Sequence, residues 1–199
     1  MLRAVIVCIF LLILSVRIQL YKPTLQFMTN KTNENYNPEF MQRAISLSEI
    51  AYTSGKGLPI GCVIVRNGEI IGEGHNEIFL RNNPTSHGEM VAIENACKNI
   101  GDLQLADCEM YTTLEPCPMC LGAIYWAKLS VVYYANTNEN AAEAGFDDSF
   151  IFEEFKLPPE KRRIPMYSKH TAEAMKVLQN WKSKNIPSSQ PWSENDSHH

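Results

Sequence analysis

Two cysteines separated by two residues, Cys117 and Cys120, are the feature that most constrains this chain. Pro118 follows the first of them, and proline is preferred as the first residue of a helix, where its missing N–H leaves no bond unmade. This placement makes Cys117 the helix cap and puts Cys120 on the same face of the first turn. Because the positive end of a helix lowers the pKa of nearby thiols, both sulfurs are expected to bind a metal ion as thiolates.

A histidine and a glutamate two residues apart, His87 and Glu89, complete the candidate site. The apolar pattern that follows residues 84–86 predicts that a second helix begins here. Only at a helix start can two side chains with this spacing face one centre. One imidazole and two thiolates leave the fourth position of a tetrahedral zinc ion for water, which is typical of catalytic zinc. We therefore expect zinc on His87 and the two cysteines, with Glu89 free to carry a proton between water and substrate.

The combined pattern, H-x-E followed by P-C-x-x-C, resembles the zinc-dependent nucleobase deaminases. Two longer runs are similar to the bacterial-type guanine deaminases: Leu-Gly-Ala-Ile-Tyr-Trp-Ala at residues 121–127 and Ala-Glu-Ala-Gly-Phe-Asp-Asp-Ser-Phe-Ile at residues 142–151. The resemblance extends from about Glu39 to about Trp181. It implies hydrolytic deamination of a purine base, with guanine converted to xanthine and ammonia as the expected reaction.

The resemblance also assigns two residues to the substrate. Asn76 matches the asparagine that contacts the base in guanine deaminases, and an amide offers the donor and the acceptor that a purine edge requires. Asp148 matches an aspartate that these enzymes use on the substrate, where a carboxylate can accept hydrogen bonds from the N–H groups of guanine. His75 has no such counterpart and is expected to be structural.

Alternating helical and strand patterns predict an α/β domain with helices packed on a sheet. Periodicity, caps and turn signals place helices at residues 38–52 and 171–182, after His87 and after Cys117, and strands at residues 60–65, 69–72, 107–114 and 129–135. The resemblance implies a cytidine-deaminase-like fold with a mixed five-stranded sheet. It also implies a homodimer in which the C-terminal segment is domain-swapped.

The chain divides into an N-terminal segment at residues 1–37, a deaminase domain at residues 38–183 and a flexible polar tail at residues 184–199. The apolar run at residues 4–14 fits a secretory signal or a membrane anchor, and a start codon set too far upstream explains it equally well. It is shorter than the ~20 residues that span a bilayer. Thiolate ligands favour a reducing compartment, so we expect a cytoplasmic enzyme without membrane contact unless the apolar run is retained.

A formal net charge of −4 and a pI near 5.8 argue against a nucleic-acid partner, because phosphate backbones are usually met by clustered Lys and Arg. The expected partner is therefore a small-molecule purine. Two alternatives stay open. A transfer-RNA adenosine deaminase or a cytosine or guanosine deaminase would use the same zinc motif. A non-catalytic zinc-binding module would need a fourth protein ligand, such as His75.

The sequence departs from the resembled family at three places. Gly88 replaces the alanine usual between the histidine and the glutamate, which weakens the helix start by up to about 1 kcal/mol. Ile60 stands where the relatives tend to have an aromatic residue, so one wall of the base pocket is expected to differ. The family's terminal tyrosine has no sure counterpart, although Trp192 is close to its position.

Overall fold

A computed structural model describes residues 36–184 of the 199-residue chain. The predicted N-terminal apolar run lies outside the described residues, as does the predicted polar tail beyond residue 184. Within residues 36–184, no helix combines the length and the apolar character that crossing a membrane requires.

Four strands form one mixed sheet in the order β2-β1-β3-β4. The strands are β1 (Gly61–Arg66), β2 (Glu69–His75), β3 (Cys108–Leu114) and β4 (Val131–Asn136). β1 runs antiparallel to β2 and β3, whereas β3 and β4 are parallel. Asn67 and Gly68 join β1 to β2 with positive φ angles of 53° and 79°, as the Asn-Gly pair predicts for a two-residue hairpin turn.

The expected fifth strand is absent from the described residues, so that part of the prediction is wrong. After β4 the chain forms short helices, and the segment before the last of them, residues 162–171, contains no strand. Pro165 interrupts this stretch and has no N–H to donate to a ladder. Ile164 beside it is 81% exposed. The outer edge of β4 therefore has no neighbouring strand within residues 36–184.

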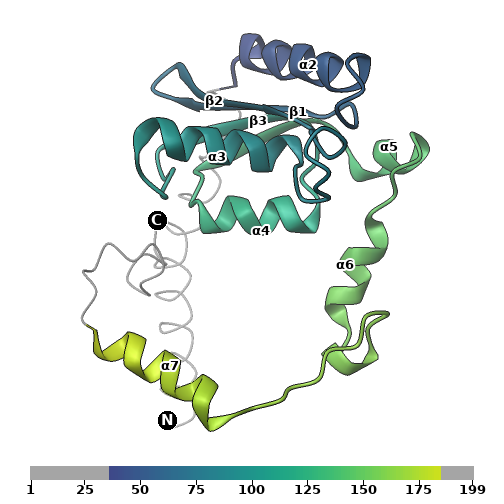
Figure 1. Cartoon of the computed structure of the whole chain (residues 1–199). Coiled ribbons are helices and arrows are strands. Elements are labelled where there is room, and N and C mark those ends of the chain that lie inside the picture. Colours follow the sequence, from purple (N-terminus) through teal and green to yellow (C-terminus); the bar gives the residue numbers. More distant parts are fainter. Residues whose placement is uncertain (1–35, 185–199) are drawn as a thin grey trace, which may run out of the picture. The chain divides into compact units, whose positions relative to one another are not determined.

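Helices cover both faces of the sheet and make a three-layer α/β arrangement (Figure 1). One face carries α2 (Pro38–Thr53), which packs Met41, Ala44 and Leu47 against Val63, Val65 and Tyr111. The other face carries α3 (Gly88–Ile100) and α4 (Pro118–Trp126), whose Ala92, Ala96 and Ile124 join Cys62, Ile64, Cys108 and Met110. The predicted α/β class and the three helices of the core are confirmed.

Two glycines of β2 allow α3 to lie directly on the sheet. A Cβ atom at Gly72 would come within 2.6 Å of the Ala92 carbonyl oxygen, and one at Gly74 within 2.3 Å of the Gly88 carbonyl oxygen. Backbone can approach this closely only where a side chain is missing. The start of α3, which carries His87 and Glu89, is thereby fixed against β2.

Beyond β4 the chain forms α5 (Asn138–Glu143), α6 (Ser149–Lys156), a short 3-10 helix (Pro159–Lys161) and α7 (Ala172–Ser183). The final helix was predicted, and the Thr171 hydroxyl caps it by accepting a hydrogen bond from the Ala174 N–H. The sequence patterns did not indicate α6. Every residue from 163 to 184 is exposed, so this segment contributes nothing to the two cores described above.

Candidate active site

The metal-ligand candidates sit at the starts of two helices, as their spacing predicted. His87 is the N-cap residue of α3, and Cys117 is the N-cap residue of α4, with Pro118 in the first helical position. The Cys117 sulfur accepts a hydrogen bond from the Cys120 backbone N–H at 3.5 Å. Both helix starts therefore direct their unpaired N–H groups and positive ends toward the same place.

The three ligand atoms lie at spacings that suit zinc. His87 Nδ1 is 3.6 Å from Cys117 Sγ and 3.5 Å from Cys120 Sγ. All three atoms lie within 4.8 Å of one another. A tetrahedral zinc ion with its usual bond lengths, ~2.0 Å to nitrogen and ~2.3 Å to sulfur, holds a nitrogen and a sulfur about 3.5 Å apart. The donor set and its spacing thus fit zinc.

The two thiols differ in acidity. The pKa of Cys117 is lowered to about 4, chiefly by its hydrogen bond with the Cys120 side chain and further by the His87 ring. The pKa of Cys120 is raised above that of an ordinary thiol, first by the neighbouring Cys117 and then by burial. Two adjacent sulfurs cannot both carry charge cheaply, so the Cys117 thiolate raises the pKa of its neighbour. Binding of a metal ion by both thiolates stays a prediction.

Glu89 lies on the first turn of α3 with its side chain buried, 3% exposed. Its Oε2 atom is 3.5 Å from Cys120 Sγ, and its Oε1 atom accepts a hydrogen bond from the Thr112 hydroxyl at 3.2 Å. Burial raises the pKa of this carboxyl. A carboxyl group with a raised pKa beside a metal-ligand cluster is suited to take up and release a proton.

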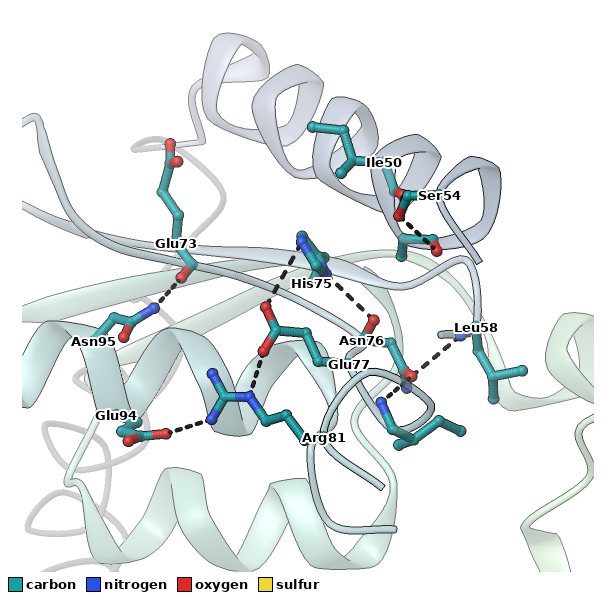
Figure 2. Close-up of polar contacts among 12 residues, drawn as sticks. Ile50, Ser54, Leu58, Glu73, His75, Asn76, Glu77, Arg81, Glu94 and Asn95 are labelled. Atoms are coloured by element: carbon teal, nitrogen blue, oxygen red, sulfur yellow. Dashed lines mark hydrogen bonds and ion pairs between the residues drawn. The ribbon is translucent and has the colours of Figure 1, made fainter. Parts of the chain in front are cut away.

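Asn76 follows the last residue of β2 and is fully buried. Its Oδ1 atom accepts hydrogen bonds from the backbone N–H groups of Leu58, at 3.1 Å, and Ile78, at 3.3 Å (Figure 2). Its Nδ2 atom is buried and has no hydrogen-bond partner among residues 36–184. The acceptor of this amide therefore holds the backbone, and the contact of Asn76 with a base stays a prediction.

Asp148 is the N-cap residue of α6 but makes no cap hydrogen bond with its side chain. Its Oδ1 atom is buried and has no partner. The pKa of Asp148 is raised, first by burial and then by the negative charge of Cys117, which places the carboxyl within electrostatic reach of the metal ligands. Among the described residues only one other buried side-chain oxygen or nitrogen lacks a partner, Asn138 Oδ1.

His75 does not join the metal-ligand group. Its Nε2 atom lies 3.7 Å from a carboxylate oxygen of Glu77, and its Nδ1 atom lies 3.3 Å from the Asn76 carbonyl oxygen (Figure 2). The group of His, Cys and acidic side chains that could hold a metal among residues 36–184 consists of His87, Cys117 and Cys120. The non-catalytic alternative required a fourth protein ligand such as His75, and none of the residues from 36 to 184 supplies it.

Sequence reasoning missed two contributors to the site. Thr112, which contacts Glu89, is one threonine among several in a strand, and no pattern distinguishes it. Gly57 is needed because a Cβ atom there would lie 2.2 Å from Asn76 Oδ1. The two glycines at positions 55 and 57 signalled only the end of α2, not the packing of this turn on Asn76.

Comparison with known proteins decides the family. Residues 34–136 match the family described as the cytidine and deoxycytidylate deaminase zinc-binding region. The chain belongs to this family. A protein similar to this deaminase along most of its length is the guanine deaminase of Bacillus subtilis (strain 168), 49% identical over 144 residues, which are 72% of this chain and 92% of that protein.

A solved structure of Bacillus subtilis guanine deaminase superposes on this deaminase with a TM-score of 0.72 and 48% identity, covering 74% of this chain and 94% of that one. The deaminase is also similar to the tRNA-specific adenosine deaminase of Streptococcus pyogenes serotype M18, 43% identical over 100 residues. That match spans 50% of this chain and 62% of the relative. The similarity to the guanine deaminase therefore covers a larger part of this chain than the similarity to the tRNA-specific adenosine deaminase does.

Proposed function

We propose that this chain is a zinc-dependent guanine deaminase, which hydrolyses guanine to xanthine and ammonia. The observation that carries the proposal is the position of Glu89, buried beside three converging metal-ligand atoms without being one of them. Similarity to a guanine deaminase over 92% of that protein's length supports the choice of guanine. His87, Cys117 and Cys120 are the residues that would hold the zinc.

Zinc, when bound, would supply a Lewis acid that lowers the pKa of a water molecule, so that this water can lose a proton and attack the carbon bearing the amino group. Glu89 takes that first proton and delivers it to the ring nitrogen, then carries the remaining proton of the added hydroxyl group to the amine, which leaves as ammonia while the carbon becomes a carbonyl. Burial favours the neutral, proton-carrying form of the carboxyl, so Glu89 can hold the proton between the two transfers. The net reaction consumes one water molecule for each guanine.

Two unpartnered polar atoms are proposed to hold the base. Asn76 Nδ2 is a buried donor, and Asp148 Oδ1 is a buried acceptor. Buried polar groups are normally hydrogen-bonded, so atoms left over in this way mark places where a ligand completes the bonding. Guanine carries ring and exocyclic N–H donors for the carboxylate, and carbonyl and ring-nitrogen acceptors for the amide.

The test is ammonia release from guanine, guanosine, adenine, cytosine and an adenosine-containing transfer-RNA anticodon stem-loop. Glu89→Gln should keep the bound zinc and lose turnover by roughly 10²-fold to 10⁴-fold. Glu49→Gln, at an exposed glutamate on α2, is the matched control and should behave as wild type. Retained turnover in Glu89→Gln would remove this residue from its role, and release from the RNA alone would favour the adenosine deaminase.

We also propose that the enzyme is a homodimer in which the C-terminal segment of each chain packs on the other. Large apolar side chains of α4 and α7 are exposed: Tyr125 at 76%, Trp126 at 62%, Leu178 at 65% and Trp181 at 55%. α4 is apolar and α7 is amphipathic, and both would gain stability if these side chains were buried against a second copy of the chain. Light scattering of purified protein should give twice the chain mass, and a monomeric active enzyme would contradict the proposal.

Two further expectations accompany this function. Residues 38–183 are proposed to form the deaminase domain, and a reducing compartment such as the cytoplasm suits the free thiols at Cys62, Cys97, Cys108, Cys117 and Cys120. Cell fractionation tests the location, since recovery of the enzyme in an exported or membrane fraction would contradict it.

A further inference from the structure

The two oxygens of the Glu89 carboxylate face different surroundings. Oε2 is 3.5 Å from Cys120 Sγ and so lies on the side of the metal ligands. Oε1 accepts a hydrogen bond from the Thr112 hydroxyl, at 3.2 Å, on the side of the sheet. The mechanism above uses a proton at the metal side, so it depends on a carboxylate orientation that keeps one oxygen there.

A glutamate does not fix this arrangement by itself. The last torsion of its side chain is broad and roughly two-fold, so the carboxylate turns unless a hydrogen bond holds it. Threonine suits the purpose, because its β-branched side chain has few rotamers and keeps its hydroxyl in one direction. A hydroxyl carried by a rigid strand therefore fixes the carboxylate better than a long flexible donor would.

Thr112 is held firmly in its own place. It lies in β3, one of the two inner strands of the sheet, where it pairs with Cys62 of β1 and Tyr134 of β4. Its side chain is fully buried, at 0% exposure, so bulk water does not compete for the hydroxyl. Successive residues of a strand point to opposite faces, which places Thr112 on the face covered by α3 and α4 with Met110.

We propose that Thr112 is a positioning residue for the deamination: its hydroxyl holds Oε1 of Glu89 against the sheet and keeps Oε2 directed at the metal-ligand side. This inference rests on the proposed function and adds a residue to it. Thr112 acts through Glu89 and does not touch the base. Its loss is therefore expected to reduce turnover and leave binding of the base almost unchanged.

The test compares three variants of the zinc-loaded, full-length enzyme. Thr112→Val has nearly the same shape without the hydroxyl and should lower kcat by roughly 10-fold to 100-fold, with KM within about twofold of wild type. Thr112→Ser restores the hydroxyl and should recover most of the rate. Thr113→Val is the matched control one residue along, where the hydroxyl oxygen accepts from the Gly61 N–H at 3.1 Å on the opposite face of the sheet. It should lose stability and keep kcat.

Zinc content and melting temperature are measured for each variant, and crystal structures of wild type and Thr112→Val give the orientation of Glu89. A kcat of Thr112→Val equal to that of the wild type, or an unchanged orientation of the Glu89 carboxylate, would overturn the inference. So would an equal loss of kcat in Thr113→Val, since this would point to general destabilisation. If the wild type deaminates none of the bases, the proposed function fails, and the crystal comparison alone decides whether Thr112 sets the orientation of Glu89.

Discussion

Replacement of Arg81 by methionine tests how the loop between Asn76 and His87 is fixed. The Arg81 guanidinium donates through Nε to the Glu77 carboxylate and lies, through Nη1, 3.2 Å from the Glu94 carboxylate of α3 (Figure 2). Glu77 directly follows Asn76, and its backbone N–H donates to the Ser86 carbonyl at 2.9 Å. Arg81 therefore connects the residue next to Asn76, the amide proposed to bind the base, with α3, the helix that has His87 as its N-cap.

The two ion pairs are expected to differ in strength. The side chains of Arg81 and Glu94 are 40% and 43% exposed, and such pairs contribute at most about 1 kcal/mol. The Glu77 side chain is only 14% exposed, and leaving a covered charge without its partner costs about 1–3 kcal/mol. Because the Arg81 side chain is well exposed to solvent, we expect the total loss of stability to lie in the lower part of the range that these two costs give together. We expect Arg81→Met to lower the free energy of unfolding by about 1–2 kcal/mol.

The assay is urea denaturation of zinc-loaded protein together with guanine kinetics. Lys98→Met is the matched control, because Lys98 pairs with the same Glu94 at 2.5 Å, is 69% exposed and does not touch the loop. Its free energy of unfolding should change by less than ~0.5 kcal/mol. Arg81→Met should also raise KM for guanine more than it lowers kcat, because it loosens the backbone beside Asn76 rather than the proton-carrying group.

A second variant examines the cause of the loss. If the cost in Arg81→Met arises from an unpaired covered carboxylate, then adding Glu77→Gln should recover most of the lost stability, since a neutral amide needs no cation. Equal, small losses in Arg81→Met and Lys98→Met would refute the reasoning. No recovery in the double variant would do so as well, because it would assign the effect to packing of the arginine side chain.

Two further predictions concern Asn76 and the metal ligands. Gly57→Ala should reduce kcat/KM for guanine by roughly 10-fold or more, because its Cβ would lie 2.2 Å from Asn76 Oδ1 and displace that amide. By contrast, Gly68→Ala, at a φ of +79° with no atom within 4 Å, should cost about 1 kcal/mol of stability and leave the kinetics unchanged. After chelation at neutral pH, iodoacetamide should modify Cys117, whose pKa is about 4, well before Cys62, whose pKa burial raises. Peptide mass spectrometry checks this order, and failure of added zinc to protect Cys117 would contradict its role as a ligand.

Local signals predicted the part of the fold that carries the site. Pro38 and Pro118 mark helix starts because their fixed φ angle and missing N–H suit that position alone. Asn67 and Gly68 mark a tight hairpin because both residues tolerate positive φ angles. The placement of the metal-ligand candidates follows from such helix starts, because the backbone sets the direction of a side chain at an N-cap. Each of these predictions needed only a few neighbouring residues.

The C-terminal part could not be predicted in the same way. The apolar residues of α7 have helical spacing, yet this helix has no buried residue, and neither has α6, which the sequence patterns did not indicate. A periodic pattern indicates that an apolar face exists and does not say what covers it. The fifth strand was expected from the family resemblance alone, and no local pattern could test it, because strand pairing depends on a distant partner. The role of Thr112 is also non-local: it depends on β3 and α3 meeting at one point, and the separation in sequence hides this contact.

Gly88 shows how contacts between residues far apart in the sequence shape the start of α3, where the metal-ligand candidate His87 is the N-cap. Alone, Gly88 weakens the start of α3, and the sequence gives no compensation for the missing methyl group. In the structure, a Cβ atom at this position would lie 3.0 Å from the Ile60 carbonyl oxygen, which already accepts a hydrogen bond from the Asn76 N–H at 2.8 Å. The absent methyl group therefore lets the helix start lie close to the strand end that holds Asn76. Two of the three departures from the resembled family, Gly88 and Ile60, meet at this one contact, between the metal-ligand candidate His87 and Asn76, the residue proposed to bind the base.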